Sequence, residues 1–459
     1  MFAPRGLANR SLLLIGGDFG TAVVTAYGTR LLVGHDTALP TPNKFNLVAG
    51  LLGLTYVAAI YFQDLYALER PRSRSAIVAS LVAIGVTLAA CFAMAQLASP
   101  ELALGRRFYL SYIACGTVTL ATWRLAIHSV MLRHGRLGVM VLGVGESGPL
   151  IAEEVRKREH LGYNLLGFIE KAVRSETPVP MPEGGKLYAL ASLGDWAPPA
   201  PVSALIIPDR GNLPFNASEL LQWRLRGVDI VDFESFYERL TGRLPVTLLQ
   251  ESWLVFAPGF QRSRASVLGK RVLDIVAALV VGAVGMAIAA LTAVAIKLDS
   301  PGPVLYWQER VGHDGKVFRL YKFRSMQAEA EAAGKALWAK TGDTRITRVG
   351  RVIRRLRIDE LPQLFNVLKG EMSIVGPRPE RPQIVAELSR LLPLYAYRHT
   401  IRPGLTGWAQ VCFRYGASVD DSLQKLCYDL YYVKNWSLLL DIQILVQTIK
   451  VIVLGRGAR

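Results

Sequence analysis

Apolar residues gather in long runs along the first third of the chain. Each run is about 18 to 25 residues long, enough for an α-helix to cross the hydrocarbon core of a bilayer. The runs cover residues 11–33, 45–62, 76–98 and 108–132. A fifth apolar run, at 272–296, follows much later in the chain. This pattern predicts a four-helix transmembrane bundle over residues 1–135 and one further membrane-embedded helix.

Charged residues flank and interrupt these runs. Arg5 and Arg10 precede the first helix, and Arg133 follows the fourth. Because positive charges beside membrane helices favour the cytoplasmic side, both ends of the bundle are expected in the cytoplasm. Asp18 and Arg124 lie inside the runs. Such groups either mark a pathway or hold helices together, and the second interpretation is favoured.

The middle of the chain reads as alternating strands and helices. An apolar stretch at 138–142 runs into the letters GVGESG at 143–148, and a helix pattern follows at 151–159. Strand, glycine-rich turn and helix in this order are typical of the first unit of a Rossmann fold. Residues 136–257 are therefore predicted to form a Rossmann-like α/β domain. Further strands are expected at 165–169 and 204–207.

Two functions fit the glycine-rich turn. It could bind a dinucleotide, with Glu170 after the second strand on the ribose, or its glycines could simply let the helix pack on the sheet. No Tyr-x-x-x-Lys pair, expected of a dehydrogenase or sugar epimerase, occurs in the chain. The scaffold interpretation is favoured. A membrane-bound, NAD-dependent nucleotide-sugar-modifying enzyme is kept as the alternative, and a non-catalytic nucleotide sensor as a third hypothesis.

After a linker at 258–265, residues 266–459 mix both patterns. Strands are expected at 304–307 and 317–323, joined through a turn at 313–315. Helices are expected at 329–340, 349–356 and 361–368. The last helix, at 438–453, is apolar with scattered polar residues, which suits either a membrane surface or a protein core. The pattern predicts an α+β, membrane-associated domain.

The composition limits the classes of molecule that the chain is expected to bind. The chain has 459 residues, of which 51% are hydrophobic, and a formal net charge of +17. In a membrane-rich chain such an excess suits anionic lipid or phosphate groups. No nucleic acid is expected as a partner, because no helix-turn-helix, zinc-finger or RNP-like pattern is present. The four cysteines form no CxxC pair, which favours free thiols in a reducing compartment.

An adjacent carboxylate pair, Asp359 and Glu360, lies in a strongly basic segment. Nine Lys or Arg and four acids fall between Arg345 and Arg381. Pro362 fits only the first turn of a helix, so both carboxylates are expected at a helix N-terminus. An N-cap is one interpretation, but the surrounding charges favour a site for a polyanion and a divalent metal. Nearby arginines are expected to keep Asp359 ionised, as a nucleophile requires.

Several cations could bind phosphate beside this pair. On a strand, Lys322 and Arg324 point to one face and Phe323 to the other. The rigid turn at 377–379 presents a single guanidinium, a group that binds phosphate bidentately. The candidate substrate-binding residues are Lys322, Arg324, Arg354, Arg378 and Arg414.

The region 270–459 resembles the bacterial sugar transferases that are monotopic phosphoglycosyl transferases. The stretches that carry the resemblance are KRVLDIVAA, KLDSPGPVLYWQERVG, YKFRSM, RITRVGRVIRRLRIDELPQLFNVLKGEMSIVGPRPERP, RHTIRPGLTGWAQV and YDLYYVKNWSLLLDI. The four N-terminal helices and the Rossmann-like middle domain look like those of the large members of this family, which initiate exopolysaccharide, capsule or O-antigen synthesis. The letters VTLLQESWLVFAPGFQRS and LGRGAR look most like the exopolysaccharide branch associated with PEP-CTERM protein-sorting systems.

The resemblance implies a two-step transfer. Asp359 would attack the β-phosphate of a UDP-sugar and release UMP, and undecaprenyl phosphate would then take the sugar phosphate from the aspartate. Glu360 matches the second carboxylate, and Mg²⁺ would be bound by both. Arg378, Arg354 and Arg414 match family arginines that contact nucleotide or phosphate. Glucose or galactose is the sugar expected from the family's commonest substrates.

The resemblance also implies an overall organisation. It predicts a membrane α-helical bundle plus an α/β Rossmann-like domain plus an α+β membrane-associated catalytic domain (266–459) with a re-entrant helix at 272–296. The protein would be a multi-pass protein of the bacterial inner (cytoplasmic) membrane, in contact with membrane lipid and with its catalytic domain facing the cytoplasm. The middle domain could serve regulation or a homodimer. Family members usually bend the re-entrant helix at Ser-Pro, whereas this chain reads GMA at 285–287, so Gly282 and Gly285 are expected to bend it.

Overall fold

The chain folds into two compact units, Met1–Leu240 and Thr241–Arg459. The computed structural model describes residues 5–33, 42–63, 65–66, 79–85, 106–134, 137–143, 145–171, 186–190, 192–193, 196–198, 200–208, 215–249, 251–327, 345–392, 394–413 and 418–453. The helix expected at 329–340 and the candidate residue Arg414 lie outside these residues.

The first unit begins with the helices expected for the membrane bundle. They are α1 (Arg5–Val33), α2 (Pro42–Phe62) and α4 (Arg106–His134). Residues 79–85, the described part of the expected third span, are also helical. Aromatic side chains fill the core of the bundle, where the rings of Phe108 and Tyr112 stack with their centroids 6.0 Å apart. In the described part of the chain, α2, α4 and α9 (Arg264–Asp299) are long and apolar enough to cross a membrane.

The two ionisable residues inside the bundle pair with each other. Arg124 Nε donates to Asp18 Oδ1 at 3.0 Å, and its Nη2 contacts the other carboxylate oxygen. The Nη1 of the same guanidinium donates to the carbonyl of Leu65 at 3.0 Å, and the group lies over the ring of Tyr66. A buried pair whose polar atoms are satisfied within the protein favours the helix-packing interpretation over a pathway.

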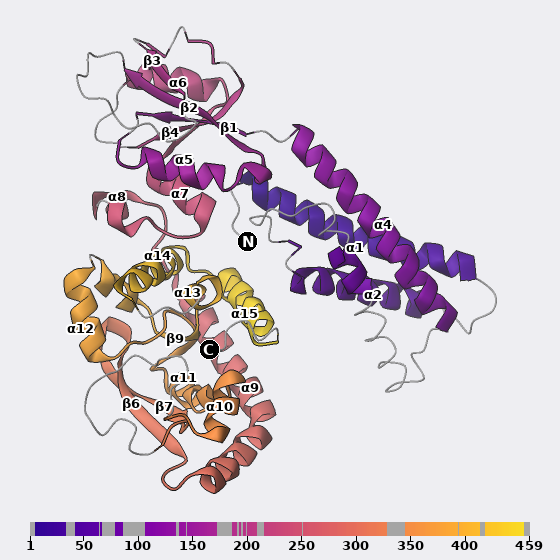
Figure 1. Ribbon diagram of the computed structural model, residues 1–459, viewed down its shortest axis with the longest axis vertical. Coiled ribbons are helices and arrows are strands. Elements are labelled where there is room, and N and C mark those ends of the chain that lie inside the picture. Colours follow the sequence, from indigo (N-terminus) through magenta and orange to yellow (C-terminus); the bar gives the residue numbers. More distant parts are fainter. Residues whose placement is uncertain are drawn as a thin grey trace. The chain divides into compact units, whose positions relative to one another are not determined.

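The rest of the first unit is built on a five-stranded parallel sheet with the order β3-β2-β1-β4-β5. The strands are β1 (Leu137–Leu142), β2 (Tyr163–Lys171), β3 (Leu187–Leu190), β4 (Val202–Ile207) and β5 (Asp229–Asp232). Figure 1 shows α5 (Gly148–Arg156) and α6 (Ala217–Leu225) on opposite faces, as right-handed crossovers in opposite directions require. The Rossmann-like prediction is confirmed at the level of a parallel α/β sheet.

The second unit consists of short strands and many helices (Figure 1). They pack around a hydrophobic core. Its strands are β6 (Leu305–Val311) and β7 (Val317–Phe323), an antiparallel hairpin, and β8 (Ser373–Val375) and β9 (Gly404–Thr406), a parallel pair. Its helices are α8 (Glu251–Phe256), α9, α10 (Arg348–Arg355), α11 (Gln363–Lys369), α12 (Pro382–Leu391), α13 (Trp408–Cys412), α14 (Val419–Asn435) and α15 (Leu438–Val453). Short 3-10 turns complete it, η3 (Val246–Leu248), η4 (His313–Gly315), η5 (Ile358–Glu360) and η6 (Tyr395–Thr400).

Residues 241–249 and 251–257 belong to the second unit, although the sequence placed them at the end of the middle domain. Leu244 N donates to the carbonyl of Cys427 at 3.0 Å. Trp408 Nε1 donates to the carbonyl of Gly242 at 2.8 Å. The compact units therefore divide at Leu240, ahead of the expected boundary at 257.

Helix α9 is one uninterrupted helix of 36 residues, about 54 Å long at 1.5 Å per residue. Its buried residues form a single stripe, namely Asp274, Ala278, Gly285, Thr292 and Ile296. A Cβ on Gly285 would lie 3.4 Å from Leu361, and one on Gly282 would lie 3.9 Å from Leu364. The expectation that these glycines bend the helix stays a prediction. They let residues beside α11 approach the helix axis.

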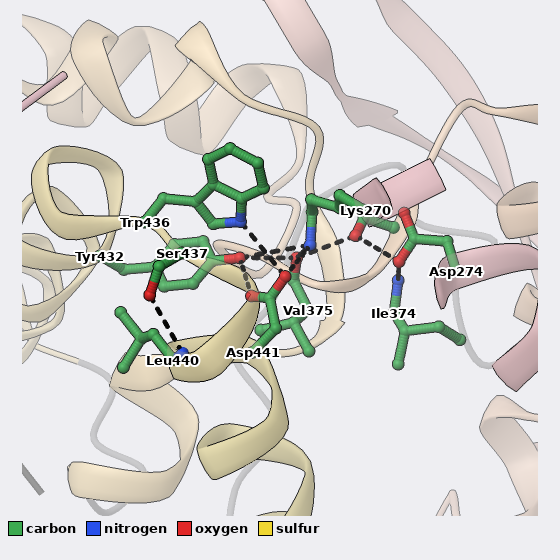
Figure 2. A network of polar contacts seen from close by, with 10 residues as sticks. Lys270, Asp274, Ile374, Val375, Tyr432, Trp436, Ser437, Leu440 and Asp441 are labelled. Atoms are coloured by element: carbon green, nitrogen blue, oxygen red, sulfur yellow. Dashed lines mark hydrogen bonds and ion pairs between the residues drawn. The ribbon is translucent and has the colours of Figure 1, made fainter. Parts of the chain in front are cut away.

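A polar network fixes the first turns of α9 against the rest of the unit (Figure 2). Lys270 Nζ lies 2.7 Å from Asp441 Oδ2 of α15 and 3.0 Å from the carbonyl of Val375. One turn later, Asp274 Oδ1 accepts a hydrogen bond from Ile374 N at 2.9 Å. Both contacts reach β8. They set the register between the apolar helix and the strand that leads to Arg378.

The far end of α9 is held by the same unit. Arg324 Nη2 donates to the carbonyl of Ser300 at 2.6 Å, and its Nη1 donates to the carbonyl of Pro301 at 2.6 Å. Asp299 Oδ2 accepts a hydrogen bond from Val349 N, at the start of α10, at 3.0 Å. A guanidinium over the last carbonyls of a helix compensates acceptors that have no partner within the helix.

Gly285→Leu should destabilise the protein by about 1 to 3 kcal/mol, because the added side chain overpacks against Leu361. Val284→Leu is the matched control, since Val284 is 74% exposed, and it should change stability by less than about 0.5 kcal/mol. Thermal unfolding of both variants in one detergent measures the difference. Equal losses at the two positions would contradict the packing role of the glycine.

Candidate active site

The carboxylate pair lies in the 3-10 turn η5, between α10 and α11. Arg357, just before it, is in the left-handed region with φ 60°. Pro362 is the N-cap residue of α11, which starts at Gln363. The expectation that Asp359 and Glu360 occupy the N-terminus of an α-helix is therefore wrong. The chain reverses at Arg357, and a tight turn presents both carboxylates before the α-helix begins.

Glu360 is surrounded by cations from three separate elements. Its Oε1 lies 2.8 Å from Arg378 Nη2, 3.3 Å from Arg357 Nη1 and 3.6 Å from Lys322 Nζ. Arg378 comes from the turn after β8, Lys322 from β7 and Arg357 from the residue that precedes η5. Although burial alone would raise the pKa of Glu360, these cations hold it well below its usual range.

Asp359 differs from its neighbour. It is 7% exposed, and no hydrogen bond or ion pair to its carboxylate is found within the described ranges. Burial and then the charge of Glu360 raise its pKa, against the opposing effect of Lys322, Arg354 and Arg378. The arginines were expected to set the direction of this shift, but desolvation exceeds them. Asp359 is thus a carboxylate of increased basicity with cations close by.

The remaining predicted cations fall in different places. Arg354, on α10, acts electrostatically on Asp359, and its Nη1 is buried without a hydrogen-bond partner. Arg324 instead holds the end of α9, and its described contacts do not include the carboxylate pair. Strand alternation predicted Lys322 and Arg324 on one face. It could not predict that the Arg324 side chain turns toward the C-terminal end of α9. The structure thus brings Lys322, Arg354 and Arg378 to the pair.

The sequence reasoning did not select Arg357 as a site residue. Its side chain reaches Glu360 because it is three residues earlier, a spacing that brings side chains together on a helical turn. That spacing was the available signal. The left-handed backbone was not predictable, because non-glycine residues rarely adopt it.

The two carboxylates are the acidic groups that could hold a metal here. Among the described residues, no group of three or more His, Cys, Asp or Glu side chains comes together. Mg²⁺ is commonly bound by one or two carboxylates together with substrate phosphates. Asp359, which lacks an ion pair in the described region, suits that role better than Glu360, whose Oε1 already faces three cations. The donor set fits a metal that arrives with a phosphate ligand.

The glycine-rich turn of the first unit has the backbone expected of it. Gly143 and Gly145 both have positive φ, at 80° and 41°. They connect β1 to α5, whose N-cap residue Ser147 makes no capping hydrogen bond. The turn therefore fits a Rossmann fold, and dinucleotide binding by it stays a prediction.

Comparison with known proteins identifies the family. The family model described as bacterial sugar transferase matches residues 265–455. The UDP-glucose:undecaprenyl-phosphate glucose-1-phosphate transferase of Escherichia coli K12 is 30% identical over 364 residues, which cover 75% of this chain and 74% of the relative. The chain belongs to the bacterial sugar transferase family. The region that the family model matches contains both carboxylates and the cations around them.

Other relatives match about half of this chain. The UDP-N-acetylgalactosamine-undecaprenyl-phosphate N-acetylgalactosaminephosphotransferase of Aeromonas hydrophila is 47% identical over 240 residues, covering 52% of this chain and 56% of the relative. The undecaprenyl-phosphate glucose phosphotransferase of Komagataeibacter xylinus is 42% identical over 243 residues, covering 51% and 46%. The chain thus spans about half the length of these two relatives. A family model described as CoA-binding domain matches residues 61–192.

Because the backbone at Arg357 is left-handed, replacing alanine by glycine should have opposite effects on stability at Arg357 and at a residue inside a helix. At Arg357, glycine should leave the protein more stable than alanine by about 1 kcal/mol, because a side chain is strained at positive φ. At the exposed Arg351 inside α10, glycine should be less stable than alanine by about 1 kcal/mol. Thermal unfolding of the four variants tests this reversal. The same order at both positions would exclude strain at Arg357.

Proposed function

We propose that this protein transfers a sugar 1-phosphate from a UDP-sugar to undecaprenyl phosphate, through a covalent intermediate on Asp359. The observation that carries the proposal is the contrast between two adjacent buried carboxylates. Glu360 faces three cations, whereas Asp359 has raised basicity and no described ion pair. A desolvated, ionised carboxylate beside cations is suited to attack a phosphorus atom whose oxygens those cations bind.

In the first step an Asp359 oxygen forms a bond to the phosphorus that carries the sugar. The bond from that phosphorus to the oxygen bridging the diphosphate breaks, and UMP leaves with that oxygen. Arg378, Lys322 and Arg354 surround the carboxylate pair. They are placed to stabilise the negative charge that spreads over the transferring phosphoryl group.

In the second step a phosphate oxygen of undecaprenyl phosphate attacks the same phosphorus. The bond to Asp359 breaks, which regenerates the carboxylate and leaves undecaprenyl-diphospho-sugar. Covalent storage on the protein lets a water-soluble donor and a membrane acceptor use one site in turn. This arrangement suits a site carried by a unit that includes the apolar helix α9.

Mg²⁺ is part of the proposal. Asp359 and Glu360 would hold it together with the donor diphosphate. When bound, it would neutralise phosphate charge and polarise the phosphorus that is attacked. Asp359 would still supply the attacking oxygen, and the arginines would still orient the phosphate.

We also propose that α9 is re-entrant, so that the second unit faces the cytoplasm from the inner membrane. Both ends of α9 contact the same compact unit, through Lys270 at one end and through Asp299 and Ser300 at the other. A straight crossing would separate those ends by a bilayer. Eleven large apolar side chains face outward between 272 and 298, which supports contact with membrane lipid. They are Val272, Val276, Leu279, Val280, Val281, Val284, Met286, Ile288, Leu291, Val294 and Leu298.

The biological role we propose is the first membrane step of exopolysaccharide synthesis. The names of two relatives, which include UDP-N-acetylgalactosamine and UDP-glucose, support one of these sugars as the donor. UDP-galactose completes the panel that tests the sugar. A homodimer, for which the first unit would supply the interface, belongs to the same proposal.

Purified full-length protein should release UMP from one UDP-sugar of this panel when Mg²⁺ and undecaprenyl phosphate are present. Asp359→Asn should abolish release, because an amide cannot act as the nucleophile. Glu387→Gln, at an exposed acid on α12, is the matched control and should leave the rate unchanged. UMP release by Asp359→Asn at the wild-type rate would sink the proposed role of this aspartate. Failure without Mg²⁺ and recovery on its return would support the metal.

The pH dependence of UMP release should report the charge of Asp359. The value of kcat/KM should fall as acid protonates this carboxyl, at a pH above the ordinary aspartate range because burial and Glu360 raise its pKa. Glu360→Gln removes the negative neighbour and leaves the cations uncompensated, and both changes lower the pKa of Asp359. The acid limb of the residual activity should therefore move to lower pH. An unmoved limb, or one at higher pH, would show that another group controls it.

A further inference from the structure

The turn that carries Arg378 is held almost entirely through its backbone. Gly376 N donates to the carbonyl of Thr406 at 2.8 Å, and Gly404 N donates to the carbonyl of Pro377 at 2.9 Å. A Cβ on Gly376 would lie 2.4 Å from the carbonyl of Arg402, so only glycine fits. Because Pro377 and Pro379 have no N–H groups, the turn can be fixed mainly through its carbonyls.

The next two carbonyls of the turn face guanidinium groups. Arg398 Nη2 donates to the carbonyl of Arg378 at 2.9 Å. Arg310 Nη1 donates to the carbonyl of Pro379 at 2.9 Å and lies 3.2 Å from Glu380 Oε2. A hydrogen bond from a charged donor is about twice as strong as a neutral one. The carbonyl groups of Arg378 and of the next residue are therefore both fixed by charged donors, Arg398 and Arg310.

Arg398 is itself oriented by a buried partner. Its Nη2 lies 2.7 Å from Asp429 Oδ2 on α14, and its Nη1 donates to the hydroxyl oxygen of Tyr395 at 2.6 Å. Arg398 is 6% exposed and Asp429 2% exposed. The charged groups that act on Asp429 are Arg398, Glu380 and Lys425, and burial raises its pKa to about 6 despite Arg398. Such a pair is weak evidence for stability, because desolvation offsets the attraction.

We propose that Arg398, oriented by Asp429, is a positioning residue for Arg378. The pair fixes the carbonyl of Arg378, which aims the Arg378 guanidinium at Glu360 and at the phosphate that would be transferred. The inference rests on the proposed function for its link to turnover. The described contacts of Arg398 and Asp429 do not include Asp359 or Glu360, so any effect on the reaction must pass through the turn.

A purely structural role would have a different signature. Arg398→Met leaves the buried Asp429 without its cation, and this should lower the unfolding temperature. The double variant Arg398→Met with Asp429→Leu removes the stranded charge. Replacing both members of a buried pair by apolar residues often restores stability. It does not restore the hydrogen bond to the carbonyl of Arg378, so stability and positioning separate in this variant.

The experiment compares wild type, Arg398→Met, the double variant and a control in full-length protein. Arg243→Met is the control, because Arg243 Nη1 contacts Gln424 of α14 at 2.6 Å away from the turn. We expect the double variant to regain the unfolding temperature. Its kcat for UMP release should stay on the order of 10- to 100-fold below wild type, as for a misplaced catalytic contact. The control should keep wild-type turnover.

Hydrogen–deuterium exchange supplies a readout that does not need activity. Peptides that cover residues 373–381 should exchange faster in the double variant than in wild type and the control, even though its unfolding temperature recovers. Recovery of both turnover and slow exchange in the double variant would overturn the positioning role. If wild type releases no UMP from any sugar donor, the proposed function fails, while the exchange of the turn still tests whether the pair positions it.

Discussion

Two neighbouring carboxylates removed from water are the constraint on which the second unit depends. Burying one charged carboxylate is costly unless it is paired, and burying two side by side adds their repulsion. Glu360 is compensated by Arg378, Lys322 and Arg357, which come from separate parts of the chain. The unit can therefore be stable with this pair only when β7, η5 and the turn after β8 are all correctly placed.

The apolar helix α9 contributes to that placement. Lys270 and Asp274 tie its first turns to β8, the strand that leads to Arg378. Its other end is fixed through Arg324, the residue just after β7, two positions beyond Lys322 of that strand. The apolar helix α9 thus contacts β8, which leads to Arg378, and the end of β7, which carries Lys322. The position of this apolar helix and the geometry of the site are linked through these contacts.

Much of this fold could be read from the sequence, and the misses have physical reasons. The strand β1 was predicted because it is a continuous apolar run before a glycine-rich turn, whereas β3, with alternating exposure over four residues, gave no such signal. At the site, the motif indicated Asp359, Glu360 and Arg378. The capping role of Arg324 and the left-handed Arg357 depend on tertiary contacts, which local pattern does not encode. The helical start expected at Asp359 failed because Pro362 permits a preceding 3-10 turn as well as a first helical turn.

The single buried stripe of α9 has a consequence for how this sequence can change over generations. Val284 and Leu291 are exposed, and in the lipid contact proposed for this face Val, Leu, Ile and Met would be nearly interchangeable. Gly285 and Ala278 have neighbours that leave little room for larger side chains. The sequence of the helix should therefore change at two rates. Residues on the outer face should be substituted freely, and residues along the buried stripe slowly. In related chains, small residues recurring along that stripe would be the record of a protein contact within an otherwise uniform apolar segment.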